Sequence, residues 1–266
     1  MENKNNIRIA FGIVLLSLLL GLVAGAALIG ILGSDSDVGG PATSLTVMGI
    51  STLIIGIPVI VYLKYRNIPM AVALRLNSIS PRSMLSVILF SIGIIVLIDE
   101  LDRIIYILFG QPEYLEELAE QLKISSIYSG MIIIVTTVLI APFVEEMLFR
   151  GYLQKILEDS WQDVTKAVLI TSLFFAFVHL NLYWVVQIYL LGLVLGFLAW
   201  RTNSIWPGLI LHGLNNGFAV ALNNTQDIFD KYYNWHEHVN PLWIICAIIL
   251  IVFGFRSLNH DLENKS

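Results

Sequence analysis

The sequence is poor in charge and in cysteine, and each shortage excludes a class of protein. Only 13% of its 266 residues are charged, against about a quarter in a soluble domain, while 57% are hydrophobic. The single cysteine, Cys246, excludes an intrachain disulfide and a cysteine-based metal cluster. The chain also lacks a glycine-rich phosphate loop, a basic nucleic-acid patch, an internal repeat and a polar stretch long enough for a second domain. We therefore predict one integral membrane domain over residues 1–266 that contacts the lipid bilayer and no nucleic acid.

Long apolar runs fill most of the chain. Most of them approach the 17 to 25 residues that cross a bilayer, which predicts an all-α, polytopic membrane helix bundle of about eight transmembrane helices. The first run has a basic start and Ala24-Gly25-Ala26 near its end, as in a signal peptide, but its long apolar core favours a retained helix. The eight runs are 9–32, 45–63, 83–98, 127–149, 165–180, 183–200, 204–222 and 241–257.

The distribution of charge predicts how the bundle is oriented. With the N-terminus inside, 12 of the 15 basic residues, Arg150 among them, fall in cytoplasmic segments, and acids collect in the outer loops. We therefore expect both termini to be cytoplasmic. The short N-terminus and compact loops are in the style of a bacterial plasma-membrane protein. Residues 112–125 predict an amphipathic helix, which lies either on the outer membrane surface or on the loop side of the bundle.

Two acids and an arginine end the fourth apolar run, where hydrocarbon is expected. Glu145, Glu146 and Arg150 fall within six residues, and ionisable residues inside a transmembrane segment are costly and usually functional. Glu146 and Arg150 are four residues apart, so one helix face brings them within reach of an ion pair. Glu145 is rotated by about 100° from Glu146 around the helix. We predict that Glu146 binds Arg150 and that Glu145 is free for chemistry.

Two of the five histidines lie in apolar segments. His179 follows Phe175 by four residues, and His212 precedes Asn216 by four, so each pair shares a helix face. One buried histidine is more often a satisfied core residue than a ligand. Two of them, with an acid pair and an asparagine on three helices, would be costly unless they share one polar cavity. Asn215 is an additional candidate contact, whereas His236, His238 and His260 fit solvated loops or the tail.

Such a cavity has the groups needed to hydrolyse an amide. A carboxylate in an apolar setting can act as general base on a water molecule. Two histidines with an acid or amide can bind zinc, or can act without metal as donors to an oxyanion. No serine or cysteine is in a recognisable nucleophile context, and the chain has no His-Glu-x-x-His helix. A water nucleophile therefore fits better than a covalent enzyme.

The ordered motifs resemble those of a known family. Glu145-Glu146-x-x-x-Arg150, Phe175-x-x-x-His179 and His212-x-x-x-Asn216 look like the CAAX-protease and bacteriocin-processing (abortive-infection) family. Its members are intramembrane endopeptidases related to the type II CAAX prenyl protease and are often called metalloproteases. The resemblance covers residues 127–223, the expected catalytic core. It implies an active site sunk in the membrane and open to the cytosolic side.

The same resemblance implies a role for each residue. Glu145 would activate the water, with Glu146 and Arg150 in support. His179, His212 and Asn216 would position that water or stabilise the oxyanion, either directly or through a zinc ion on His179 and His212. Because bacteria generally do not prenylate proteins, the expected substrate is a membrane-associated peptide or protein tail, such as a pheromone or bacteriocin precursor.

Two other functions and one geometric mismatch stand beside this hypothesis. A non-catalytic membrane scaffold or bacteriocin-immunity protein would keep the polar cluster for structure alone, and a transporter would use an acid as a proton relay. The mismatch concerns depth. With Arg150 and Lys166 as cytoplasmic helix ends, Glu145 lies about 7.5 Å and His179 about 20 Å from the respective end. A short, tilted hairpin or a cavity near mid-bilayer would each resolve it.

Overall fold

The computed structural model describes residues 2–32 and 41–264, and the long elements in these ranges are all helices. Two short strands, β1 (Asn234–Trp235) and β2 (His238–Val239), pair antiparallel with Asn234 opposite Val239. The helices, with η marking π-helical turns, are α1 (Glu2–Leu32), α2 (Pro41–Tyr65), α3 (Met70–Ala73), α4 (Pro81–Phe109), α5 (Tyr114–Gln121), α6 (Ile127–Ile133), η1 (Ile134–Ile140), α7 (Ala141–Glu146), η2 (Met147–Leu153), α8 (Gln154–Trp161), α9 (Val164–Val178), α10 (Val185–Thr202), α11 (Trp206–Asn224), α12 (Gln226–Tyr232) and α13 (Pro241–Glu263).

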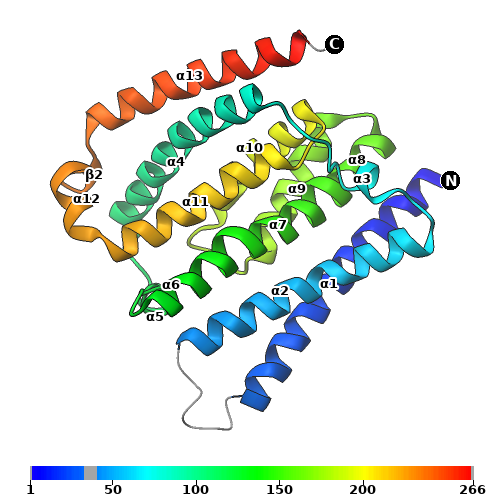
Figure 1. The fold of residues 1–266 in the computed structure, drawn as a ribbon, viewed down its shortest axis with the longest axis horizontal. Helices are drawn as coiled ribbons and strands as arrows, with labels where there is room; N and C mark the ends of the chain where they lie inside the picture. Colours follow the sequence, from blue (N-terminus) through cyan, green and yellow to red (C-terminus); the bar gives the residue numbers. More distant parts are fainter. Residues whose placement is uncertain (1, 33–40, 265–266) are drawn as a thin grey trace.

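The long helices form a row in which α7 and α11 are central. In Figure 1 the order across the molecule is α13, α4, α11, α7, α2 and α1, and each neighbouring pair is in contact. α10 packs against α9, α11 and α4. Both termini lie at the same end of the bundle in this view. The motifs predicted to carry chemistry are on α7, α9 and α11, so they lie in the middle of the row.

Helices occupy all eight predicted apolar segments, which confirms a polytopic, all-α bundle. In the described part of the chain, six helices are long and apolar enough to cross a membrane. α9 is apolar but shorter, with 15 residues, and α11 is not among the six. The number of eight spans therefore stays a prediction. The protein is an integral membrane protein, and the predicted loop between the first two spans includes residues 33–40, which lie outside the described residues.

The fourth segment differs most from the prediction. A continuous helical run extends from Ile127 to Trp161, so the predicted end at residue 149 is wrong. The charge distribution places Arg150 in a cytoplasmic segment, but its side chain is completely buried within this helical run. The run continues past Arg150 because the polar residues that follow, Gln154 and Glu158, are also buried against protein partners.

Two apolar clusters pack on either side of the central helices. One joins α1, α2, η2, α8 and α9, and it includes Ala10 and Val14 of α1, both fully buried. The other joins α4, α10, α11 and α13. Local signals set the helix starts, since Ser80 caps α4 before Pro81 and Asp163 accepts the Lys166 N–H to cap α9. The polar groups of α7 therefore lie between two clusters of buried apolar side chains.

The amphipathic helix predicted at residues 112–125 is α5, which covers Tyr114–Gln121. Its Leu115 is buried, and the chain around it is held by Asn223 and Asn224, at the end of α11, which donate to the carbonyls of Ala119 and Leu122. Tyr114 also donates to Asn181 in the loop between α9 and α10. These contacts favour the interpretation that the helix packs on the loop side of the bundle.

Candidate active site

The two acids lie on α7, a six-residue α-helical segment between two π-helical turns. Single π-helical turns inside α-helices are rare and frequently occur at functional sites. In η1 the Ala141 N–H donates to the carbonyl of Thr136, five residues earlier, and the next residue, Pro142, has no N–H to donate. Thr137 thus has no backbone donor at the next position. The local sequence both widens the helix and frees a carbonyl about two turns before the acids.

Glu146 and Arg150 form the ion pair that their spacing predicts. Arg150 Nη1 lies 3.2 Å from Glu146 Oε1, and both side chains have no exposed surface. Arg150 also lies over the ring of Phe175, with Cζ 4.0 Å from the centroid, and its Nη2 donates to the Gly192 carbonyl at 3.4 Å. A buried pair of this kind is stable only when further polar and aromatic contacts support it.

Small residues on α10 and α11 make room for this pair. A Cβ on Gly208 would lie 2.6 Å from Glu146 Oε2, and one on Gly192 would lie 3.4 Å from Arg150 Nη2. Any larger residue at position 208 would push the carboxylate away. The sequence analysis did not include these glycines, because a glycine in an apolar helix gives no sign of which side chain it faces.

His179 ends α9 with its ring held in one orientation. Its Nδ1 lies 2.6 Å from the carbonyl oxygen of Phe175. A carbonyl only accepts hydrogen bonds, so Nδ1 carries the proton and Nε2 of the neutral ring has a free lone pair. This Nε2 lies 3.9 Å from Glu145 Oε2.

His212, on α11, is arranged in the same way but is more deeply buried. Its Nδ1 lies 3.1 Å from Glu146 Oε1, and its Nε2 lies 3.6 Å from Glu145 Oε2. With Arg150 as its counter-charge, Glu146 accepts the Nδ1–H of His212. Both imidazoles also pack edge-on to Phe175. Phe175 therefore contacts Arg150 and both histidines, which explains its place in the predicted motif.

Two of the predicted residues, His179 and His212, thus converge on one carboxylate oxygen of a third, Glu145. Glu145 is 27% exposed and His179 30% exposed by side chain, so the pair can be reached, whereas His212 is 6% exposed. Glu145 Oε2 accepts no hydrogen bond from any described residue. The arrangement gives a carboxylate able to take a proton, next to two imidazole nitrogens whose other nitrogens are already bonded.

The depth mismatch between Glu145 and His179 disappears because its premise was wrong. The helix that carries Glu145 ends at Trp161, not at Arg150, so Glu145 lies 16 residues from that end. His179 lies 15 residues from Val164, where α9 begins. At about 1.5 Å per residue the two depths agree within a few Å. His212 lies only six residues into α11, so α11 begins well inside the bundle.

Asn216 is bound to the helix that carries the acids. Its Nδ2 donates to the Thr137 carbonyl at 2.9 Å, the same carbonyl that Pro142 leaves without a partner. Within the described residues Asn216 forms no hydrogen bond with Glu145, His179 or His212, and Asn215 contacts Asn216 at 3.5 Å. The structure therefore joins Asn216 to the site through η1. Of the remaining histidines, His238 donates to Glu100 at 2.7 Å and is half exposed.

The side chains at this site include donor types that bind zinc. Two imidazole Nε2 atoms and a carboxylate are the donor types that zinc prefers, and the bonded Nδ1 atoms are typical of histidine ligands. Across residues 2–32 and 41–264, however, no group of three or more His, Cys, Asp or Glu residues is placed to hold a metal ion. The residues therefore do not fit a three-ligand metal centre, and the reaction proposed for this site uses no metal.

One family model matches the part of the chain that carries the three motifs. Residues 127–218 match the model described as Type II CAAX prenyl endopeptidase Rce1-like. This match confirms the resemblance predicted from the three motifs. No curated protein and no solved structure matches the chain.

Proposed function

We propose that the protein is an intramembrane endopeptidase that hydrolyses a peptide bond with a water molecule activated by Glu145. The observation that carries this proposal is the convergence of His179 Nε2 and His212 Nε2 on Glu145 Oε2, at 3.9 and 3.6 Å. The similarity of residues 127–218 to an endopeptidase family supports it. The Glu145 Oε2 atom, which accepts no hydrogen bond within the described residues, and the bonded Nδ1 atoms of the two histidines match what a water-activating base requires.

In the proposed reaction, Glu145 accepts a proton from water while the water oxygen bonds to the substrate carbonyl carbon. The neutral Nε2 of His179 accepts the second hydrogen of the water and orients it. His212, whose Nδ1 is held by Glu146, lies beside Glu145 Oε2 and in its doubly protonated form donates Nε2–H to the oxyanion. Glu145 then gives its proton to the leaving amine as the C–N bond breaks, which completes the addition of one water molecule.

Glu146, Arg150 and Phe175 support this chemistry without touching the substrate. Glu146 fixes the His212 ring through Nδ1, and Arg150 holds Glu146 in place through the ion pair. We place the termini and the opening of the site in the cytosol of a bacterial cell, in line with the basic residues of the loops. The substrate is a membrane-associated peptide or protein tail.

The experiment compares new peptide termini in membranes and medium by mass spectrometry. Cells carry wild-type protein or Glu145→Gln, which keeps the shape of the side chain and removes the base, at matched expression. Glu100→Gln is the control, since Glu100 is 21% exposed and also bonded to a histidine, His238. We expect termini that are present with wild type and Glu100→Gln and absent with Glu145→Gln.

The same samples distinguish the other functions. His179→Gln and His212→Gln should lose the same termini as Glu145→Gln. Identical terminus profiles in all samples, with a wild-type phenotype in the Glu145→Gln cells, would refute the enzyme and favour a scaffold. Substrate flux in sealed vesicles that depends on Glu145, without any cleavage, would instead indicate a transporter.

A further inference from the structure

One face of the helical run from α7 to α8 carries four buried polar side chains. They are Glu146, Arg150, Gln154 and Glu158, each four residues after the last, and none is more than 8% exposed. Gln154 Nε2 donates to the Gly196 carbonyl of α10 at 2.9 Å and to Glu158 Oε1 at 2.8 Å. A Cβ on Gly196 would lie 2.8 Å from Gln154 Oε1. The candidate active site therefore lies at one end of a longer buried polar face, which runs from Glu146 to Glu158.

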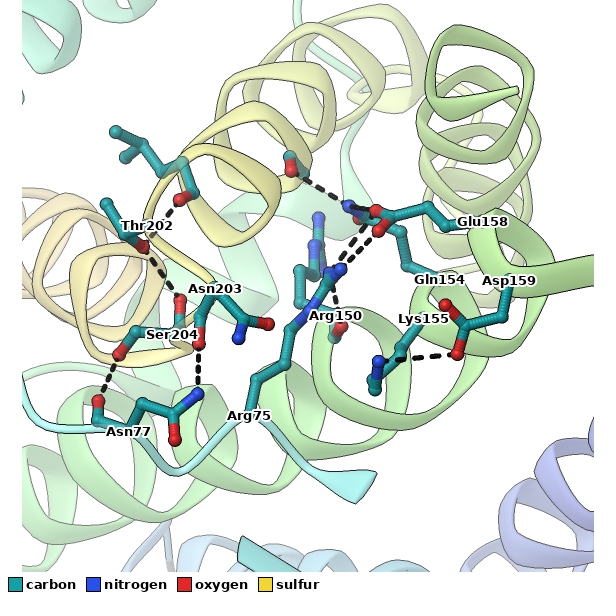
Figure 2. A network of polar contacts seen from close by, with 12 residues as sticks. Arg75, Asn77, Arg150, Gln154, Lys155, Glu158, Asp159, Thr202, Asn203 and Ser204 are labelled. Atoms are coloured by element: carbon teal, nitrogen blue, oxygen red, sulfur yellow. Dashed lines mark hydrogen bonds and ion pairs between the residues drawn. The ribbon is translucent and has the colours of Figure 1, made fainter. Parts of the chain in front are cut away.

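Arg75 closes the other end of this face. It comes from the loop between α3 and α4, is 4% exposed, and pairs with both carboxylate oxygens of Glu158. Its Nη1 also donates to the backbone carbonyl of Arg150 at 3.4 Å. Figure 2 shows the Arg75 side chain extending from its loop to Glu158, with Arg150 beside it. The buried face then holds two acids and two arginines, so its charges balance.

The backbone around Arg75 holds the start of α11. The Arg75 carbonyl accepts the Ile205 N–H at 3.0 Å, and Leu76 pairs with Ser204. Asn77 Nδ2 donates to the Asn203 carbonyl at 2.7 Å, and Ser204 Oγ donates to the Asn77 carbonyl at 2.6 Å (Figure 2). We call residues 74–77 the clasp, because they join η2 and α8 to the recessed start of α11.

Two features indicate that the clasp has little freedom. Arg75 has a φ of 51°, a left-handed conformation that non-glycine residues keep only where the surroundings impose it. A Cβ on Gly151 would lie 2.7 Å from the Leu74 carbonyl oxygen, so the clasp also packs directly on the backbone beside Arg150. The clasp thus contacts the residue next to Arg150 on one side and Ile205, seven residues before His212, on the other.

We infer that Arg75 is a positioning residue that sets α11, and with it His212, against the helix that carries Glu145 and Glu146. Its side chain anchors the clasp to Glu158 and Arg150, and its carbonyl anchors Ile205. Without this anchor the start of α11 is held by fewer contacts, and the His212 ring shifts away from its position beside Glu145 and Glu146. The effect on catalysis rests on the proposed function, whereas the effect on α11 does not.

The test compares Arg75→Gln with wild type in detergent micelles by hydrogen–deuterium exchange and by peptide cleavage. The matched control is Arg66→Gln, an exposed arginine in the adjoining loop. We expect amide exchange in residues 205–212 to become at least ten-fold faster in Arg75→Gln, with α13 unchanged. On a peptide that spans a cleavage site found in the terminus survey, kcat should fall at least ten-fold and KM should change less than three-fold. The charge-swapped pair Arg75→Glu with Glu158→Arg should recover only part of both losses, because a carboxylate at position 75 cannot donate to the Arg150 carbonyl.

Wild-type exchange at residues 205–212 in a folded Arg75→Gln protein would overturn the inference. A fall in cleavage through KM alone would also overturn it, since that would place Arg75 in substrate binding. If Arg75→Gln does not fold, Arg75→Lys keeps the charge but cannot reach Glu158 and the Arg150 carbonyl together. A folded Arg75→Lys with wild-type exchange and kcat would then refute the role. If wild type cleaves nothing, the proposed function fails, and the exchange result still decides for or against the clasp.

Discussion

Arg150 offers the sharpest test of how the site is held together. In Arg150→Met the apolar stem is retained and the guanidinium is lost, which leaves the Glu146 carboxylate buried without its counter-charge. Removing one partner of a buried ion pair costs about 3–5 kcal/mol. The contact between Arg150 and the Phe175 ring is lost as well, but the two effects involve the same group and do not simply add. We expect unfolding free energy to fall by about 4 kcal/mol, in line with the cost of an unpaired buried charge.

The measurement is unfolding in detergent micelles by added dodecyl sulfate, followed through the fluorescence of the six tryptophans. Lys155→Ala is the control, because Lys155 pairs at 3.3 Å with Asp159, whose side chain is 66% exposed. Exposed pairs of this kind contribute about 0–1 kcal/mol. Cellular protein level should fall with Arg150→Met and stay normal with Lys155→Ala.

A double variant separates the unpaired charge from the loss of packing. Arg150→Met combined with Glu146→Gln removes both charges, so at least half of the lost stability should return. An Arg150→Met protein within about 1 kcal/mol of wild type, the range of an exposed pair, would refute the reasoning. So would a double variant that is no more stable than the single one, since the loss would then come from packing alone.

Two further predictions concern the space around Glu146 and the role of metal. Gly208→Ala would put a Cβ 2.6 Å from Glu146 Oε2, so cleavage should fall at least ten-fold, while Gly217→Ala, whose nearest neighbour is 3.8 Å away, should cleave normally; equal rates would contradict the tight fit. Because the described residues form no three-ligand centre, prolonged dialysis against a zinc chelator should change the cleavage rate less than two-fold. A loss restored by added zinc would show that a metal takes part.

The sequence was sufficient to predict what happens within single helices. The Glu146–Arg150 pair follows from four-residue spacing, and the separation of Glu145 follows from the helical twist. The three motifs could be placed on three separate helices because each lies in its own apolar run. These features depend on residues close together in the chain, where spacing fixes geometry.

The burial of Gln154 and Glu158 could not be predicted from residue spacing in the same way. Gln154 and Glu158 lie beyond the apolar run 127–149, whose end predicts the wrong helix end. They are buried because the Gly196 carbonyl of α10 and the side chain of Arg75 satisfy them. These partners are far away in the chain, and no local pattern links them. The four-residue spacing of Glu146, Arg150, Gln154 and Glu158 was the one signal available.

Asn216 shows how a residue of the predicted site can act through the backbone. In η1 the hydrogen bonds run to the fifth residue, so the donor for the Thr137 carbonyl would be residue 142, which is proline. Asn216 Nδ2 supplies the missing donor at 2.9 Å. An unsatisfied carbonyl in this part-buried position costs about 1–3 kcal/mol. The carbonyl lies one turn before Pro142 on the helix that carries Glu145.

Asn216 and Pro142 are therefore coupled, and a double-mutant cycle can measure the coupling. Asn216→Ala alone should destabilise the protein by about 1–3 kcal/mol, as expected for an orphaned carbonyl. In a Pro142→Ala background, residue 142 has its own N–H for Thr137, so the same substitution should cost less than about 0.5 kcal/mol. Cleavage by the double variant should recover in parallel, with Asn215→Ala as the neighbouring control. If stability recovers and cleavage does not, Asn216 contacts the substrate as well, because the loss of activity would then be independent of η1.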